Sequence, residues 1–309
     1  SVPQHLGPGF VWRAWELIGM LSGLGRTGHV PRLLLQTLAV FACFLIIGCQ
    51  STFEDPIAGS EGGGSQFADT LGPDATPYER AIHQGQIHDA LGDRAAAELA
   101  FRDAVALREA AFGSDSGQLV EPLMQLALEV GLQGRHEEAE VLFTRIDRLL
   151  ESPASPWDVP RAWSYRAIAL SGRGDLEGAY TLALEATVER RDILTVEAQQ
   201  GGDDLRARLA PGLAELAHGL VVEGALAFRL GRIEEAELAA ALARRILVQL
   251  ETAPEWWIAE VDELIALIET ENEDFESADR RLRAALLFKQ RSFGSSRPVA
   301  LPLMSLGRV

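Results

Sequence analysis

Apolar and small residues recur along the chain at helical spacing from about residue 78 onward. They return every three or four positions, which places them on one face of an α-helix. The clearest rows are Ala97, Phe101, Ala104; Ala139, Phe143, Ile146; Ala236, Ala240, Ala243; and Ala278, Leu282, Ala285. One helix, or one pair of helices, cannot bury such a row alone. The pattern therefore predicts an all-α fold in which neighbouring helices supply the core.

A short phrase that ends in alanine occurs five times along the chain. In four of the five, this alanine is also the first residue of one of the apolar rows. It reads Gly92–Ala97, Gly134–Ala139, Gly174–Ala179, Gly231–Ala236 and Glu273–Ala278, with starts 42, 40, 57 and 42 residues apart. A period in this range is typical of a helical solenoid. Seven residues before each phrase stands a small residue: Gly85, Ala127, Ala167, Gly224 or Ala266. We predict about five helix–turn–helix repeats, in which two small residues let the paired helices cross closely.

The repeats resemble the tetratricopeptide repeat, specifically its 42-residue variety in kinesin light chains and many bacterial proteins. The resemblance is carried best by Gly113–Ile146, and its opening returns as Phe293–Gly307. It implies a right-handed α-solenoid over residues 78–309, with the first helix of a sixth repeat at the end. We expect the natural protein to continue past Val309.

In this family the first helices line a groove that binds a protein or peptide. For this sequence, the resemblance implies a partner-binding groove with polar and apolar residues, and with a mainly apolar middle. The groove residues are Gln86, Asp89, Met124, Leu128, Ile168, Ser171, Val221 and Phe228. Structural packing is the alternative role for each of them.

The 57-residue step exceeds the others by about 15 residues, located around residues 189–208. Helical patterns flank Gln199–Asp204, where a turn is followed by an aspartate that caps a helix. Two longer helices, about 175–199 and 203–229, account for the extra length and form an elongated hairpin. A disordered insertion between ordinary helices is the alternative.

The N-terminal region has the pattern of an export signal. Basic residues precede the apolar run Leu33–Gly48, and Gly48-Cys49 follows Leu-Ile-Ile. This resembles the bacterial lipobox, which implies a signal sequence over residues 1–48 and a lipid on Cys49. We expect residues 1–19 to lie upstream of the natural protein, which then begins at Met20. Residues 49–77 form a flexible linker. In a Gram-negative source, Gln50 implies an outer-membrane lipoprotein facing the periplasm; an uncleaved anchor is the alternative.

Charge and composition argue against several classes of function. The net charge of −17 opposes binding to nucleic acid, which requires clustered lysine and arginine. Both cysteines lie in the N-terminal region, Cys43 within the signal sequence and Cys49 directly after it, and the glycine patterns and histidines fit no catalytic, metal or cofactor site. The sequence therefore predicts a membrane-anchored binding scaffold for a protein or peptide, without enzymatic activity. The alternative is the sensing half of a larger enzyme, such as a caspase-like peptidase, whose catalytic domain lies beyond Val309.

Overall fold

The computed structural model describes residues 71, 74–201, 204–250, 253 and 255–293. Across these residues the chain forms ten α-helices and one 3-10 turn, with no strand, so the all-α prediction is confirmed there. The signal sequence, Cys49, most of the linker and the sixth repeat fall outside the described residues. The helices are α3 (Pro77–Ala90), α4 (Arg94–Phe112), α5 (Val120–Leu132), α6 (His136–Leu149), α7 (Asp158–Gly172), α8 (Leu176–Gln199), α9 (Leu205–Arg229), α10 (Ile233–Gln249), α11 (Glu255–Glu271) and α12 (Phe275–Phe293), with the 3-10 turn at Gly117–Leu119.

Each predicted phrase begins at a tight turn between two helices. Its first residue has a positive φ, at 74° in Gly92, 82° in Gly134, 94° in Gly174, 72° in Gly231 and 62° in Glu273. The next backbone N–H donates to the carbonyl five residues earlier, as from Arg135 to Val130 at 3.2 Å. This is the Schellman ending of a helix, which needs a left-handed residue. The same backbone geometry therefore closes all five first helices.

Small residues lie where the two helices of a pair cross. Ala97, Ala127, Ala167 and Ala266 are fully buried. A Cβ on Gly85 of α3 would lie 2.3 Å from the ring of Phe101 in α4, so only glycine fits there. The close approach lets the aromatic ring pack directly on the α3 backbone, which explains the predicted pairs of small residues.

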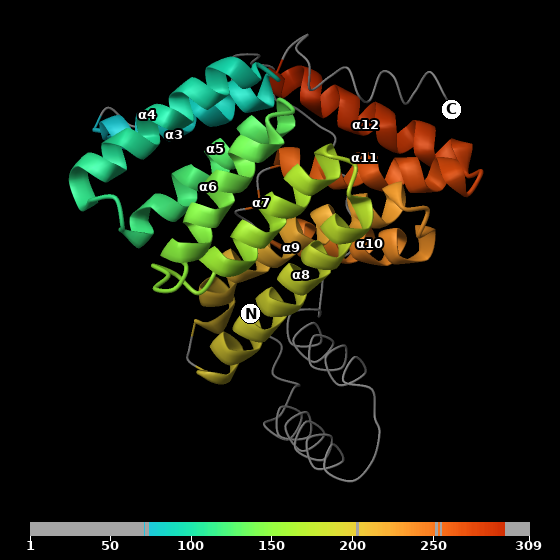
Figure 1. Cartoon of the computed structure of the whole chain (residues 1–309). Coiled ribbons are helices and arrows are strands. Elements are labelled where there is room, and N and C mark those ends of the chain that lie inside the picture. The colour runs from blue at the N-terminus through green and yellow to red at the C-terminus, as the bar shows by residue number, and fades with distance from the viewer. Residues whose placement is uncertain (1–70, 72–73, 202–203, 251–252, 254, 294–309) are drawn as a thin grey trace. The chain divides into compact units, whose positions relative to one another are not determined.

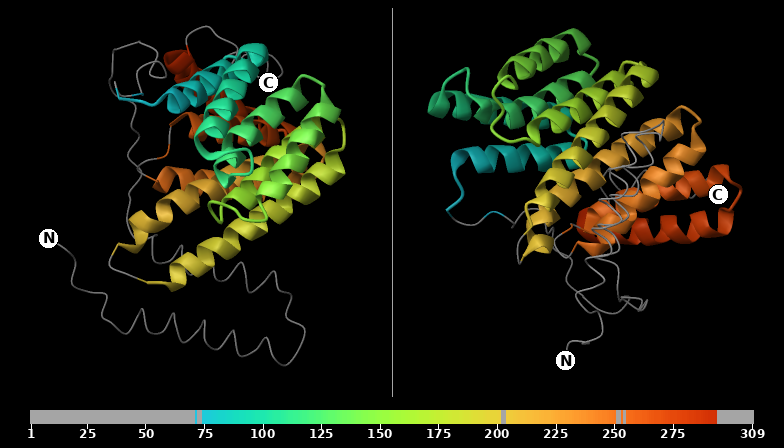
Figure 2. Two further views of the ribbon diagram at one scale, coloured as in Figure 1. Left: turned by 60° about the vertical axis from the view of Figure 1, so that its left-hand side comes forward. Right: turned by 90° about the horizontal axis from the view of Figure 1, so that it is seen from below.

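Helix pairs follow one another along the chain (Figure 1). α3 packs on α4, α5 on α6, α7 on α8, α9 on α10, and α11 on α12. Successive first helices also touch, since α5 contacts α7, α7 contacts α9, and α9 contacts α11. The views in Figure 2 show the same succession. Each pair thus covers apolar surface of the next.

The long spacing between the third and fourth phrases contains two long helices. α8 has 24 residues and α9 has 25, against 13 to 19 for the others. Their bounds match the predicted ranges within two residues, and the two helices contact each other. Asp204 occupies the N-cap of α9 but makes no side-chain capping bond, so the predicted cap lacks its hydrogen bond.

Among the described helices, α9 is long and apolar enough to cross a bilayer by length and composition. Half of its apolar window is buried inside the protein, and it packs on both α8 and α10. These contacts are those of a core helix.

Candidate partner-binding surface

The eight residues assigned to the groove divide into buried and accessible groups. Met124 is 2% exposed, Leu128 is 9% exposed and Ser171 is 8% exposed. Gln86 is exposed, whereas Asp89, Ile168, Val221 and Phe228 are half-buried. The buried three offer almost no side-chain surface to a partner.

The position of α5 explains why its apolar residues are covered. This helix packs on α4, α6 and α7 at once, and Glu121 is its one exposed residue. Ser171 in α7 is engaged inside the protein, where its hydroxyl accepts from Arg229 Nη1 at 2.9 Å. The predicted apolar middle therefore belongs largely to the core of the helix stack.

A row of polar side chains occupies an equivalent place on every first helix. Thirteen residues before each left-handed turn residue stand Glu79, Glu121, Arg161, His218 and Glu260. None of them is fully buried. From α5 onward successive first helices contact one another, so these residues occupy equivalent positions on neighbouring helices. We call them the first-helix row.

Charged groups on several first helices act on Tyr165 of α7, among them the row residues Glu121 and Arg161. Burial raises the pKa of the Tyr165 hydroxyl, and the carboxylates of Glu215, Asp89 and Glu121 raise it further. These carboxylates lie on α9, α3 and α5, so the charge of three other first helices acts on this hydroxyl.

Direct hydrogen bonds hold Glu79, Arg161 and Glu121 of the row in place. Glu79 Oε2 accepts from the backbone N–H and the hydroxyl of Thr76 at 2.7 and 2.9 Å. Arg161 donates through Nε and Nη2 to Glu215 Oε1 at 2.8 and 2.5 Å. Tyr78 donates to Glu121 Oε2 at 3.0 Å, and burial together with Glu121 raises the pKa of Tyr78 to about 12. The surface is therefore polar, partly preorganised and rich in carboxylates.

A half-buried charge cluster adjoins the row between the first two helix pairs. Arg94 of α4 donates to Glu129 of α5 at 3.1 and 3.2 Å and to Asp89 of α3 at 3.3 Å. Glu129 is 1% exposed. Burial and the neighbouring Asp89 raise the pKa of Glu129 to about 7, against the opposing effect of Arg94. Asp89, assigned to the groove from the sequence, is thus tied into a joint between helix pairs.

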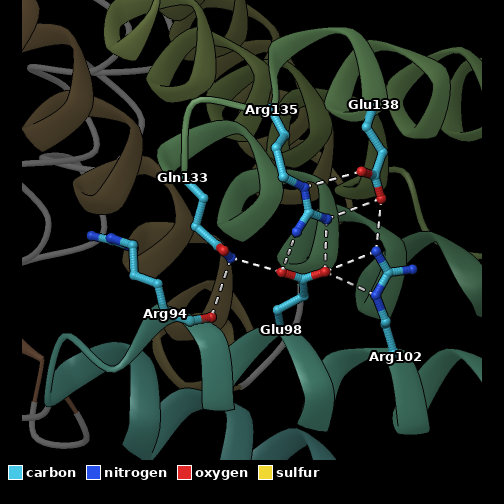
Figure 3. A network of polar contacts seen from close by, with 6 residues as sticks. All are labelled: Arg94, Glu98, Arg102, Gln133, Arg135 and Glu138. Carbon is cyan, nitrogen blue, oxygen red and sulfur yellow. Dashed lines mark hydrogen bonds and ion pairs between the residues drawn. The ribbon is translucent and has the colours of Figure 1, made fainter.

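A second network joins α4 to the turn and helix that follow α5 (Figure 3). Glu98 accepts from Arg135 at 2.7 and 2.9 Å, from Arg102 at 2.9 Å and from Gln133 at 2.8 Å. The Arg135 hydrogen bonds are the main cause that lowers the pKa of Glu98 to about 2. Both carboxylate oxygens are engaged, so this network stabilises the helix stack and leaves no group for a ligand.

The part of the chain that the structure describes contains no group of three or more possible metal ligands. His218, on α9, contacts the ring of Trp257 from α11 at 6.3 Å between centroids. Burial and the charge of Arg190 lower the pKa of His218 to about 4, so it is neutral at physiological pH.

The sequence analysis missed Glu121, Arg161, Tyr165 and Glu215 as surface residues. Three of the five members of the first-helix row are glutamates, and only the turn register reveals their equivalence. No protein-family model matches the sequence, and no curated protein is significantly similar to it.

Proposed function

We propose that this protein is a tetratricopeptide-type interaction scaffold whose first-helix row binds a protein or peptide. The observation that supports this most is the fivefold recurrence of one turn geometry, which joins the two helices of each pair, together with the packing of each pair on the next. Stacked helix pairs of this kind form extended surfaces that hold other chains. A right-handed solenoid is the arrangement that this repetition favours.

The charge of the row favours a partner segment with basic side chains. Glu79, Glu121 and Glu260 are exposed, and the chain as a whole carries a net charge of −17. Opposite charge on the partner would accelerate encounter and fix register more than it would add affinity. The half-buried Ile168, Val221 and Phe228 supply limited apolar contact on the same helices.

We further propose attachment to a membrane through lipid on Cys49, with residues 50–76 as the tether. The apolar run before Cys49 and the glycine-rich composition after it support this arrangement. In a Gram-negative source the scaffold would face the periplasm from the outer membrane. Substituting Cys49→Ser should release the protein from the membrane fraction if the proposal holds.

Charge reversal on matched surfaces tests the binding proposal. One variant combines Glu121→Lys and Glu260→Lys in the row; the control combines Asp103→Lys and Glu237→Lys, which are exposed on the second helices α4 and α10. Both variants change the net charge equally. Affinity capture from the source cells, read by quantitative mass spectrometry, should lose a partner with the row variant and keep it with the control. Equal retention or equal loss of every captured protein would contradict the proposed surface.

A further inference from the structure

The residue that follows each left-handed turn residue alternates between aspartate and arginine along the chain. It is Asp93, Arg135, Asp175, Arg232 and Asp274 in turn. Each aspartate accepts a hydrogen bond from the backbone N–H three residues later, at 3.1 to 3.2 Å, and so caps its own second helix. Each arginine instead reaches the second helix of the preceding pair. One position in the repeat therefore has two different roles.

The two arginines bridge one helix pair to the next. Arg135 donates to Glu98 of α4 at 2.7 and 2.9 Å, and Gln133 donates to the same carboxylate (Figure 3). Arg232 donates to Glu177 of α8 at 2.7 Å, and its guanidinium carbon lies 4.6 Å from the centre of the Tyr180 ring. An arginine side chain inserted between successive pairs is therefore a recurring part of this architecture.

The joint between the second and third pairs has an open groove where the position is occupied by Asp175. About 250 Å³ of space, open to solvent, lies between α6 and α7. Its apolar lining consists of Ala139 and Phe143 of α6 and Ala169 and Leu170 of α7, and its polar rim consists of His136, Glu140, Arg166 and Arg173. Glu140 stands six residues after its turn glycine, as Glu98 does at the joint that Arg135 bridges. The groove is thus the counterpart of a site that holds an arginine elsewhere in the chain.

The charged groups around the groove leave one carboxylate in excess. Arg166 donates to Glu140 and, at 3.0 Å, to Asp147, while Arg173 forms an ion pair with Asp175 at 3.9 Å. Three carboxylates therefore face two guanidinium groups. The hydrogen bond from Arg166 ends on Oε1 of Glu140, and no donor among the described residues reaches Oε2. One acceptor at the rim remains available to a further cation.

We propose that the α6–α7 groove binds an arginine side chain of a partner protein. The guanidinium binds Oε2 of Glu140, so that two arginines share this carboxylate as Arg102 and Arg135 share Glu98. The aliphatic stem lies on the apolar lining. The net charge of −17 attracts a basic partner from a distance. None of the groove residues belongs to the first-helix row, so this is a second site beside the one proposed above.

The probe is the tripeptide acetyl-Ala-Arg-Ala-amide, and the control peptide carries citrulline in place of arginine. Citrulline keeps the shape of the side chain and removes its charge. The readout is the NMR shift of the Ala139 and Ala169 methyl groups in the full chain. The arginine peptide should shift both resonances along a saturating curve, and the citrulline peptide should bind at least tenfold more weakly.

Two matched variants test the repeat equivalence. Asp175→Arg places an arginine where Arg135 and Arg232 stand in other repeats, so it should fill the groove from within and weaken peptide binding at least tenfold. Asp93→Arg makes the same change of charge at the equivalent position of the first repeat, away from the groove, and should leave the affinity unchanged.

Three outcomes would overturn the proposal. They are equal affinity for the two peptides, equal affinity in Asp175→Arg and the wild-type protein, and peptide binding that leaves both alanine methyl groups unmoved. Peptide shifts that vanish in the Glu121→Lys, Glu260→Lys variant would place the peptide on the first-helix row instead. If Asp175→Arg does not fold, Glu140→Gln decides: it should weaken binding at least tenfold, and an unchanged affinity would contradict the site.

Discussion

Glu273 is the turn residue that departs from glycine while keeping the same backbone conformation. Its φ is 62°, in the left-handed region where the other four turns have glycine. An L-residue with a Cβ costs about 1–2 kcal/mol in that region, and glycine costs little. Glu273→Gly should therefore raise the unfolding free energy by about 1 kcal/mol, measured by urea denaturation.

The control for this substitution is the reverse change in another turn. Gly231 has φ 72°, and no atom lies within 4 Å of a Cβ built there. Gly231→Ala should thus lower the unfolding free energy by about 1 kcal/mol through backbone strain alone. An unchanged or lowered stability of Glu273→Gly would contradict the shared turn geometry.

Glu129 makes the joint between the first two helix pairs sensitive to pH. Its pKa is raised from 4.5 to about 7 in the folded protein, so the folded state binds a proton that the unfolded state has lost. Stability from this group is therefore present below about pH 4.5 and falls as the pH rises to about 7. Urea denaturation from pH 5 to 8 should show this decline in the wild-type protein. It should be smaller in Glu129→Gln.

Asp103→Asn provides the matched control, since Asp103 is exposed on α4 and takes part in none of the hydrogen bonds described here. Its pH profile should follow that of the wild-type protein. If Glu129→Gln also follows the wild-type profile, the buried carboxyl does not titrate in this range.

At the scale of the helix pair, Gly85 tests the close crossing of α3 and α4. An added methyl would overlap the fully buried Phe101 ring, with 2.3 Å between the nearest carbons. Overpacking of a rigid core site typically costs 1–3 kcal/mol. Gly85→Ala should lower the unfolding free energy by about that amount, even though alanine favours helices.

Gly172 at the end of α7 supplies the comparison. The nearest atom to a Cβ there is Leu132 Cδ2 at 3.8 Å, an ordinary contact. Gly172→Ala should leave stability unchanged or slightly higher in the same denaturation assay. Equal effects of the two substitutions would mean that helix propensity, and not close packing, governs both positions.

The elements were predictable because their signals are local. A glycine that ends a helix, an alanine that crosses closely and an apolar row at period 3.6 are each visible within a dozen residues. Even the turn at Glu273 and the long helices 176–199 and 205–229 follow from spacing.

The candidate surface was less predictable because burial depends on several helices at once. Met124 and Leu128 resemble surface groove residues when α5 is considered alone, but three neighbouring helices cover them. The first-helix row could have been found by counting back from each turn. The effect of Glu215, Asp89 and Glu121 on Tyr165, and the complete burial of Arg190, depend on how several helices pack together.

Across the whole described region the same helix-pair unit is repeated, and the contacts between successive units vary. Apolar contacts within and between successive helix pairs form the core clusters, and charge networks such as that around Glu98 fix particular contacts between pairs. Because the core does not depend on the polar residues of the first helices, these residues differ from repeat to repeat. Under the proposed function, the core and the turns determine stability, and the first-helix row determines recognition.

Site-specific photo-cross-linking in the source cells tests the central claim most directly. A photoreactive amino acid is placed at Glu121 or Glu260 in the first-helix row, and at Leu99 or Leu238, which are 66% and 72% exposed on second helices. If the row binds the partner, one protein should cross-link from both row positions and from neither second-helix position. Cross-links from the second helices alone, or from none of the four positions, would contradict the account.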